Sequence, residues 1–195
     1  TRSSLVSWAR VWEEGNNVFG NFNICVTSNT IASAPACNIN TTAGATCATA
    51  TSICSLDGYC GNTISFSPNF WPQLDADFRT CIGSSNTSID PIIQNNSFLK
   101  FTAAAATAQF KVWVTSTTTG LGIQMMFFKS NTCGSGSIIC HGGYDDIRPG
   151  PEKIITATGL TPDSTYYLMI DGVSNDQCNY VIGAVSGLSL SLIHI

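Results

Sequence analysis

Short runs in which apolar and polar residues alternate fill the second half of the chain. Phe110, Val112 and Val114 take every second position of one such run, which places them on one face of a β-strand. Glycine, proline, asparagine and aspartate, the residues that favour turns, separate the runs. Strands are therefore predicted at 97–103, 109–115, 122–129, 152–158, 164–171 and 179–186. With a turn at 160–163 and no helical period after residue 25, the pattern predicts an antiparallel β-sandwich.

The N-terminal part of the chain has a different pattern. Leu5, Trp8, Val11 and Trp12 recur at helix-like spacing, although the same stretch also fits an extended arm. The stretch 25–55 is rich in threonine, alanine and serine and holds four cysteines. We expect irregular structure there, pinned by disulfides.

The chain divides into three predicted parts: an N-terminal extension at 1–45, a sandwich domain at 46–187 and a short tail at 188–195. The codons CTG-TCT-CTT-ATA-CAC-ATC, the end of a transposon used to prepare sequencing libraries, encode residues 190–195. We therefore expect the tail to be translated adapter. A genuine last strand is the alternative, because leucine and serine alternate through 188–192.

The surface of the protein carries few charges. Only 10% of the 195 residues are Asp, Glu, Lys or Arg, and the net charge is −4. Nucleic-acid binders and membrane-surface helices need clustered basic residues, so neither kind of partner is expected. No apolar run is long enough for a bilayer span, and 44% hydrophobic residues argue against disorder. A polar, weakly charged surface favours an extracellular or cell-surface protein.

The nine cysteines indicate an oxidising compartment. No Cys-x-x-Cys pair occurs and the chain has only two histidines, so a zinc site is disfavoured. We expect an exported protein with at least three, and about four, disulfides. The leftover thiol is either free and buried or bridges to another chain. The first candidate pair is Cys133 with Cys140, which flank a glycine-rich turn, and the second is Cys60 with Cys81.

Four segments of the chain resemble a known module. They are CATATSICSLDGYCGNT (47–63), NNSFLKFTAAAATAQFKVWV (95–114), GIQMMFF (122–128) and LTPDSTYYLMIDGVSNDQCNYVIGAVSG (160–187). In this order they are similar to a repeated β-sandwich module of large, adhesin-like surface proteins of the Bacteroidota, of the gliding-associated, type IX-secreted kind. LDGYCGNT and MIDGxxxDxC are the more specific motifs, and the L-T-P-x-x-x-Y-Y turn also resembles bacterial pre-peptidase C-terminal domains. The resemblance implies export, a jelly-roll-like sandwich and no catalytic residues.

Residues suited to catalysis or metal binding are few. Nucleophilic catalysis needs a base beside the nucleophile, and the one credible base, His141, adjoins Cys140, which we expect in a disulfide. We therefore expect no enzymatic activity. Asp171 and Asp176 lie in a tight loop between two strands, and carboxylates are ligands that Ca²⁺ prefers. Calcium is thus a weak candidate, although acidic residues are also normal in turns, and no other cofactor is expected.

Several positions are candidates for glycosylation. Asn40, Asn86 and Asn95 each begin an Asn-x-Ser/Thr sequon. Ser164 is a further candidate, because Asp-Ser-Thr at 163–165 is similar to the acceptor that Bacteroidota use for O-glycans. A plain turn is the alternative for that site.

The absence of a catalytic constellation favours a structural or adhesive role, as a surface adhesin module or the subunit of an extracellular filament. Apolar residues of the N-terminal arm have no obvious place in the sandwich. These assembly candidates are Leu5, Val6, Trp8, Val11 and Trp12. We expect the arm to pack on, or add a strand to, the next copy of the chain and so build a homopolymer, with the ninth cysteine as a candidate bridge between copies. An arm that folds back on its own chain is the alternative.

Aromatic residues offer a rival function of another class. A row of exposed aromatic side chains would make the protein a carbohydrate-binding module of a secreted hydrolase, with surface glycans as its ligands. Trp113 is the residue of most interest, because it lies on the opposite face of its strand from Phe110. Aromatic residues in β-proteins more often belong to the core, so packing between sheets or subunits is the simpler expectation.

Overall fold

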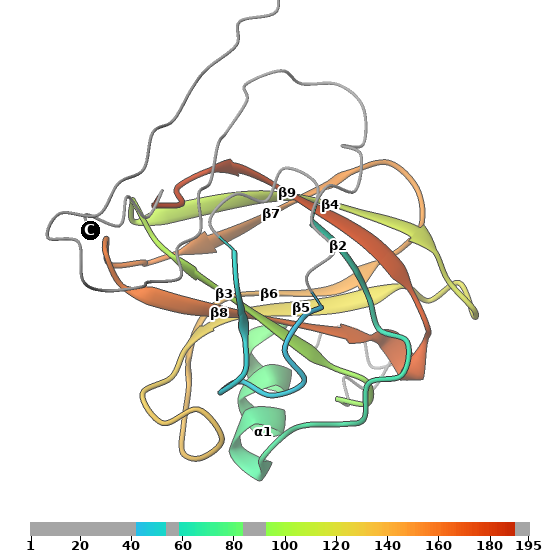
Figure 1. Cartoon of the computed structure of the whole chain (residues 1–195), viewed down its shortest axis with the longest axis horizontal. Coiled ribbons are helices and arrows are strands. Elements are labelled where there is room, and N and C mark those ends of the chain that lie inside the picture. The colour runs from blue at the N-terminus through green and yellow to red at the C-terminus, as the bar shows by residue number, and fades with distance from the viewer. Residues whose placement is uncertain (1–41, 54–58, 84–92, 190–195) are drawn as a thin grey trace, which may run out of the picture.

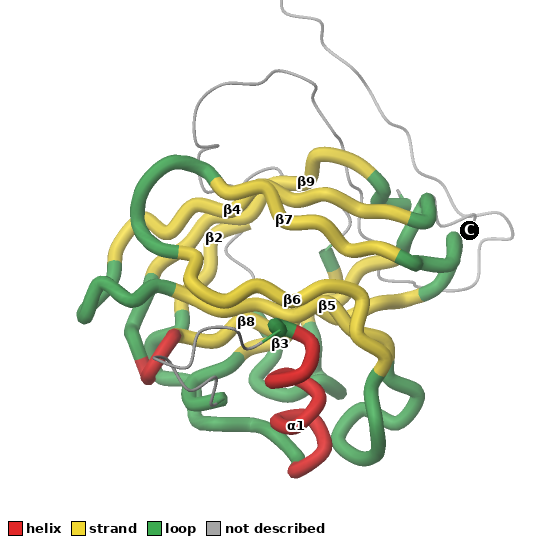
Figure 2. The backbone as a smooth tube through the Cα atoms, turned by 180° about the vertical axis from the view of Figure 1, so that it is seen from behind, coloured by secondary structure: helices red, strands yellow, loops and turns green. Residues whose placement is uncertain are grey.

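Two stacked β-sheets form the body of the molecule, and one helix covers the outer face of one sheet (Figure 1, Figure 2). The computed structural model describes residues 42–53, 59–83 and 93–189. Its elements are β1 (Thr51–Ser52), β2 (Tyr59–Asn62), α1 (Pro72–Cys81), β3 (Ser97–Thr102), β4 (Thr107–Ser116), β5 (Ile123–Lys129), β6 (Ile139–Ile147), β7 (Lys153–Thr158), β8 (Thr165–Gly172), the 3₁₀ turn η1 (Val173–Asn175) and β9 (Asn179–Ser186).

The strand order is that of a jelly roll. One sheet has the order β2-β9-β4-β7 and the other has the order β1-β3-β8-β5-β6. From β2 to β9, successive strands alternate between the two sheets except at β5 and β6, and neighbouring strands are antiparallel. The two-residue strand β1 adds to the edge of β3 in parallel. This arrangement of eight strands in two sheets confirms the predicted all-β, antiparallel sandwich of jelly-roll type.

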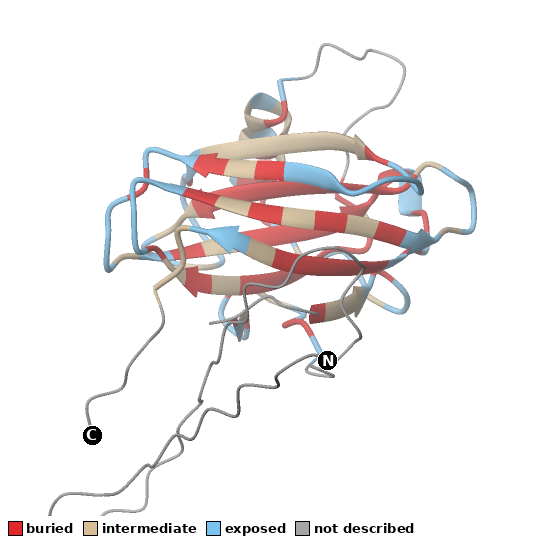
Figure 3. Ribbon diagram, turned by 90° about the horizontal axis from the view of Figure 1, so that it is seen from above, coloured by how far each residue is buried: buried red, intermediate tan, exposed pale blue. Residues whose placement is uncertain are grey.

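All six predicted strands are present, with bounds that differ from the prediction by at most two residues. The alternation in β4 arises because one face of its sheet packs on the core while the other faces outward. Phe110, Val112 and Val114 are almost fully buried, whereas Lys111 and Trp113 between them are only half-buried. Figure 3 shows the same alternation along the strands of this sheet.

The sequence did not predict β1, β2, α1, β6 or η1. The expectation of no helix after residue 25 is wrong, because α1 begins with Pro72 in its first turn, a position that favours proline. Only Leu74 and Phe78, one helical turn apart, are buried in α1, so its apolar stripe is narrow. The strand β6 is half-buried along most of its length, and it therefore lacks the alternation that marks β4.

The main core lies between the two sheets. Phe110 of β4 and Phe127 of β5 come from opposite sheets, and their rings stack with 5.0 Å between centroids. Phe101 of β3 meets Phe110 edge-on at 5.3 Å. Ring pairs at these separations stabilise a core beyond the area that they bury, so the aromatic side chains join the two layers.

A second apolar cluster lies under α1, on the outer face of the five-stranded sheet. Met126 and Phe128 of β5 pack there with Leu74 and Phe78 of the helix. Trp71, just before the helix, is buried in the same cluster and donates its indole N–H to the Gly136 carbonyl at 2.7 Å. Since both faces of β5 are covered, its residues Met125–Phe128 form a continuous apolar run.

Two disulfides lie on the helix side of the sandwich, and both predicted pairings are wrong. Cys47 is bonded to Cys133, with 5.4 Å between their Cα atoms, and Cys81 is bonded to Cys140, with 5.7 Å. Cys140 lies in β6, the strand that contacts α1, and it therefore meets the last residue of the helix. The loop between β5 and β6 carries Cys133 to Cys47 instead.

Cys60 and Cys81 do not meet, because β2 belongs to the four-stranded sheet and α1 covers the other sheet. Cys60 is nevertheless disulfide-bonded. Five of the six described cysteines are thus oxidised, as expected for a disulfide-stabilised fold. The sixth, Cys178, is free and buried, which is one of the two expected states of the leftover thiol.

The sandwich extends beyond the predicted boundaries of 46 and 187. Ala43 is buried in the main core, and Gly44 pairs with Phe98 in an isolated bridge. At the other end Leu188 pairs with Ala103. Residues on both sides of the predicted domain therefore belong to the sheets.

Candidate functional site

Loops at one end of the sandwich converge on the buried carboxylate of Asp176. Its Oδ1 accepts hydrogen bonds from the backbone amides of Thr118 and Thr119, and its Oδ2 accepts hydrogen bonds from those of Leu121 and Gly122, each at 2.9 Å. Burial by itself would raise the pKa of Asp176, but the amide hydrogen bonds outweigh it and lower the pKa below its ordinary value. The ionised carboxylate thus fixes the loop between β4 and β5.

A second buried carboxylate, Asp171, lies at the end of β8. Its Oδ1 accepts the amides of Gln94 and Asn95 at 3.0 and 2.8 Å, and its Oδ2 accepts the Gln124 side-chain amide at 2.7 Å. Burial raises the pKa of Asp171 to about 6, because these hydrogen bonds only partly offset the loss of hydration. Folding therefore shifts the pKa values of the two acids in opposite directions.

The raised pKa of Asp171 predicts a pH-dependent effect of Asp171→Asn. Between the unfolded value near 4 and the folded value of about 6, the native state binds the proton more tightly, so this carboxyl contributes stability at low pH that is lost as pH rises. We expect the stability of the variant relative to wild type to increase from pH 4 to pH 7, by on the order of 2 kcal/mol. Urea unfolding across that range measures it, and a pH-independent difference contradicts the prediction.

Asn95 connects the two acidic positions, and Thr63 connects Asp176 to Cys178. The Asn95 side chain donates to the Asp176 carbonyl at 3.0 Å and accepts from the Gly172 amide at 2.7 Å. The Thr63 hydroxyl donates to the same carbonyl at 2.8 Å and accepts from the Cys178 amide at 2.9 Å. A Cβ atom at Gly172 would overlap that carbonyl oxygen, so this close approach requires glycine.

The network joins the two most specific motifs of the sequence. LDGYCGNT supplies Thr63 and MIDGxxxDxC supplies Asp171 and Asp176, and the pairing of β2 with β9 brings the two motifs together. Asn95 is only 2% exposed, so the prediction that it is a glycosylation site is wrong: its side-chain amide is already bonded inside the protein. The motif residues hold loops together.

The network leaves the calcium candidates with little capacity for a cation. The carboxylate oxygens of Asp176 accept hydrogen bonds from four N–H groups, and those of Asp171 accept hydrogen bonds from three. Ca²⁺ would need these same oxygens as ligands. No group of three or more potential metal ligands occurs among the described residues. The loop is therefore held by hydrogen bonds.

His141, the residue considered as a catalytic base, lies in β6, an edge strand of the five-stranded sheet. Its Nδ1 is 2.9 Å from the Thr158 carbonyl oxygen, and its ring meets Tyr166 edge-on with 4.8 Å between centroids. Since a carbonyl only accepts hydrogen bonds, Nδ1 carries a proton. The neighbouring Cys140 is in a disulfide, as expected, so it offers no thiolate. That the protein has no enzymatic activity stays a prediction.

The thiol of Cys178 is enclosed by the same network. Its Sγ lies 3.3 Å from the Gly122 carbonyl oxygen. Burial, together with the charge of Asp176, raises the pKa of Cys178 to about 12. A thiol that stays protonated is a poor nucleophile, which disfavours it as the expected bridge to another chain.

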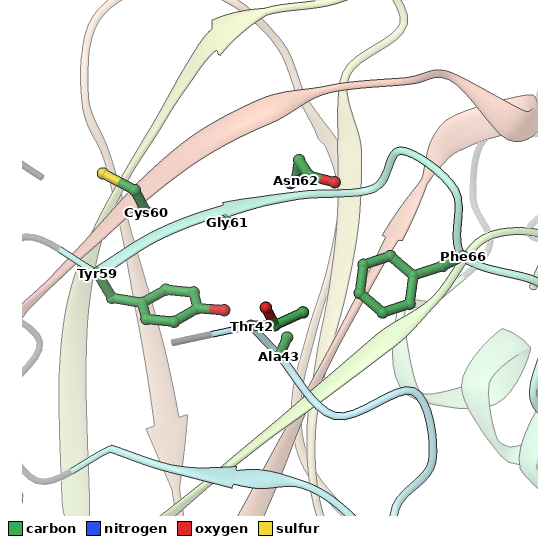
Figure 4. Close-up of a pocket in the computed structure, with 7 residues that line it drawn as sticks. All are labelled: Thr42, Ala43, Tyr59, Cys60, Gly61, Asn62 and Phe66. Atoms are coloured by element: carbon green, nitrogen blue, oxygen red, sulfur yellow. The ribbon is translucent and has the colours of Figure 1, made fainter. Parts of the chain in front are cut away.

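A pocket of about 180 Å³ opens beside the edge strand β2 (Figure 4). Tyr59 and Phe66 line it with apolar surface, and Thr42 and Asn62 add polar groups. Figure 4 shows the Tyr59 and Phe66 side chains on the inner side of β2, whereas the Cys60 side chain points the other way. The pocket was not predicted, because its walls come from segments that are distant in sequence.

The remaining candidates fall into two groups. Ser164 is half-buried after a turn in which Asp163 has a φ of 62°, so the predicted turn is confirmed, while its glycosylation stays a prediction. The other candidates lie outside the described residues: Asn40, Asn86, Leu5, Val6, Trp8, Val11 and Trp12.

Comparison with known proteins adds no relative. Neither a scan against protein-family models nor a search of curated proteins finds a match for the chain. Within the described residues, no helix has the length and apolar character needed to cross a bilayer.

Proposed function

We propose that the protein is an extracellular structural or adhesive protein, either a surface adhesin module or the subunit of a self-assembling filament. The observation that carries the proposal is where the aromatic residues lie. Within the described part of the chain, Phe70 is the one aromatic side chain that is exposed. The others are buried or half-buried, which favours a role in packing over a row of aromatic side chains that stack on a ligand.

The polar features also support a structural role. The carboxylate oxygens of Asp171 and Asp176 accept hydrogen bonds from backbone amides, and these bonds fix the loops. The disulfides constrain a sandwich whose two sheets are already joined by an aromatic core. A protein that works outside the cell benefits from such constraints, because disulfides persist in oxidising surroundings.

The proposal is tested by the assembly state of the full chain and of a variant that lacks residues 1–24. We expect the full chain to form fibres or large oligomers in negative-stain micrographs and sedimentation, and the deletion variant to stay monomeric. Trp8→Ser with Trp12→Ser should act like the deletion, and Arg10→Ser is the matched control. A monomeric full chain at high concentration, or fibres from the deletion variant, would show that the proposal is wrong.

A carbohydrate-binding module remains the rival. Trp113 is half-buried on the outer face of the four-stranded sheet, and it is the aromatic residue of that face on which a sugar ring could stack. Retardation of the protein in gels that contain soluble polysaccharides, lost in Trp113→Ala, would favour the rival.

A further inference from the structure

The edge strand β2 carries a disulfide whose second cysteine lies outside the described residues. Cys60 is disulfide-bonded. The other described cysteines are either bonded to one another or free. Its partner in the chain is therefore Cys25, Cys37 or Cys54.

Geometry argues against Cys54. The preceding residue, Ile53, is buried in the core and donates its amide to Lys100 of β3, in the five-stranded sheet. Stacked sheets are about 10 Å apart, and one residue spans about 3.8 Å, so the Cα atom of Cys54 stays about 6 Å or more from that of Cys60. A Cα separation of about 6 Å alone is compatible with a disulfide. The Cys60 side chain, however, points away from the other sheet (Figure 4), so the two Cβ atoms stay farther apart than the about 4 Å that the bond needs.

Described neighbours account for the burial on the outer face of the four-stranded sheet near Cys60. Val181 and Val185 both lie on this face of β9, and Val181 is the direct neighbour of Cys60 across the strands. Val181 is 5% exposed, but Val185, farther along the strand, is 45% exposed. Val181 lies between Cys60 of β2 and Trp113 of β4, so these two side chains shield it, and Val185 lies beyond them.

The open edge of β2 offers backbone groups to a further strand. The Thr63 amide donates to the Cys178 carbonyl of the neighbouring chain segment. Since hydrogen-bonded pairs alternate along antiparallel strands, the N–H and C=O of Asn62 point away from β9, toward the edge. Exposed edges of this kind pair readily with an extended segment.

We propose that residues 25–41 of the same chain dock on the edge of β2, held by a disulfide from Cys60 to Cys25 or Cys37, while residues 1–24 stay available to the next copy. Thr42, the residue that follows this segment, lines the pocket beside β2. The C-terminal end of the segment therefore lies next to the strand on which it docks. The five residues from Cys37 to Thr42 span at most about 18 Å, which is enough to reach Cys60. The docked segment closes the sheet edge.

Disulfide mapping of the intact, unreduced protein tests the proposal. After alkylation and denaturation, chymotrypsin cuts after Leu56 and Tyr59 and so separates Cys54 from Cys60, while thermolysin cuts before Ile31 and so separates Cys25 from Cys37. We expect the Cys60 peptide to be cross-linked to the Cys25 or the Cys37 peptide. A cross-link to Cys54, or an unlinked Cys60, overturns the proposal.

The Cys60→Ser variant gives a second measurement. We expect one new alkylated thiol, at Cys25 or Cys37, and faster proteolysis of residues 25–41 under native conditions. The matched control is Cys47→Ser with Cys133→Ser, which removes a disulfide on the opposite side and should leave that proteolysis unchanged. A wild-type band of twice the chain mass on a non-reducing gel, linked through Cys60, assigns the segment to a second copy and overturns the same-chain proposal. None of these outcomes depends on whether filaments form.

Discussion

Replacing Asp176 by asparagine is expected to destabilise the protein by about 3–5 kcal/mol at neutral pH. The carboxylate accepts four backbone amides, two at each oxygen. Asparagine keeps one oxygen and replaces the other by an NH₂ group, which faces two amides that also donate. Rotating the side chain only moves the conflict from Leu121 and Gly122 to Thr118 and Thr119.

Urea unfolding of wild type and Asp176→Asn measures the effect. Because the pKa of Asp176 is lowered in the folded state, its stabilising contribution is present above the unfolded pKa and is lost as pH falls through the folded pKa. The difference between the two proteins should therefore shrink in acid. Asp163→Asn, in an exposed turn that asparagine tolerates, is the matched control and should change stability by less than about 0.5 kcal/mol. Equal effects at both positions contradict the prediction.

Removing the bond between Cys81 and Cys140 is expected to cost about 3–4 kcal/mol. The two cysteines are 59 residues apart, and the entropy of closing a loop of that length in the unfolded chain sets this magnitude. The bond joins the end of α1 to β6. Its loss should therefore loosen the helix that covers Met126 and Phe128.

Chemical denaturation of Cys81→Ser with Cys140→Ser against wild type tests this prediction under oxidising conditions. The same comparison in excess dithiothreitol is the control, because the reduced wild type has lost the same constraint and the difference should largely vanish. Hydrogen exchange in α1 should rise in the double variant. A variant as stable as oxidised wild type would falsify the prediction.

The sequence by itself determined the fold class and most of the strands. The alternation in β4 is visible because one face of the four-stranded sheet is packed and the other faces outward, so that Phe110 and Lys111 have different surroundings. Cysteine number and spacing indicated disulfides rather than zinc for chemical reasons that need no coordinates. Alternation along a strand and the spacing of cysteines are properties of short stretches of sequence, so they can be recognised without knowledge of the fold.

The tertiary structure alone decided which residues meet. Cys133 and Cys140 are close in sequence, but β6 and the loop before it carry them to different partners. Asn95 reads as a glycosylation sequon, yet the approach of the loop that holds Asp176 buries its amide. Burial and pairing depend on segments that are tens of residues apart, and no local pattern records where those segments come together. For that reason the sequence determined the sandwich. Only the packing of its loops decided that Asp171 and Asp176 are buried and hold those loops together by hydrogen bonds.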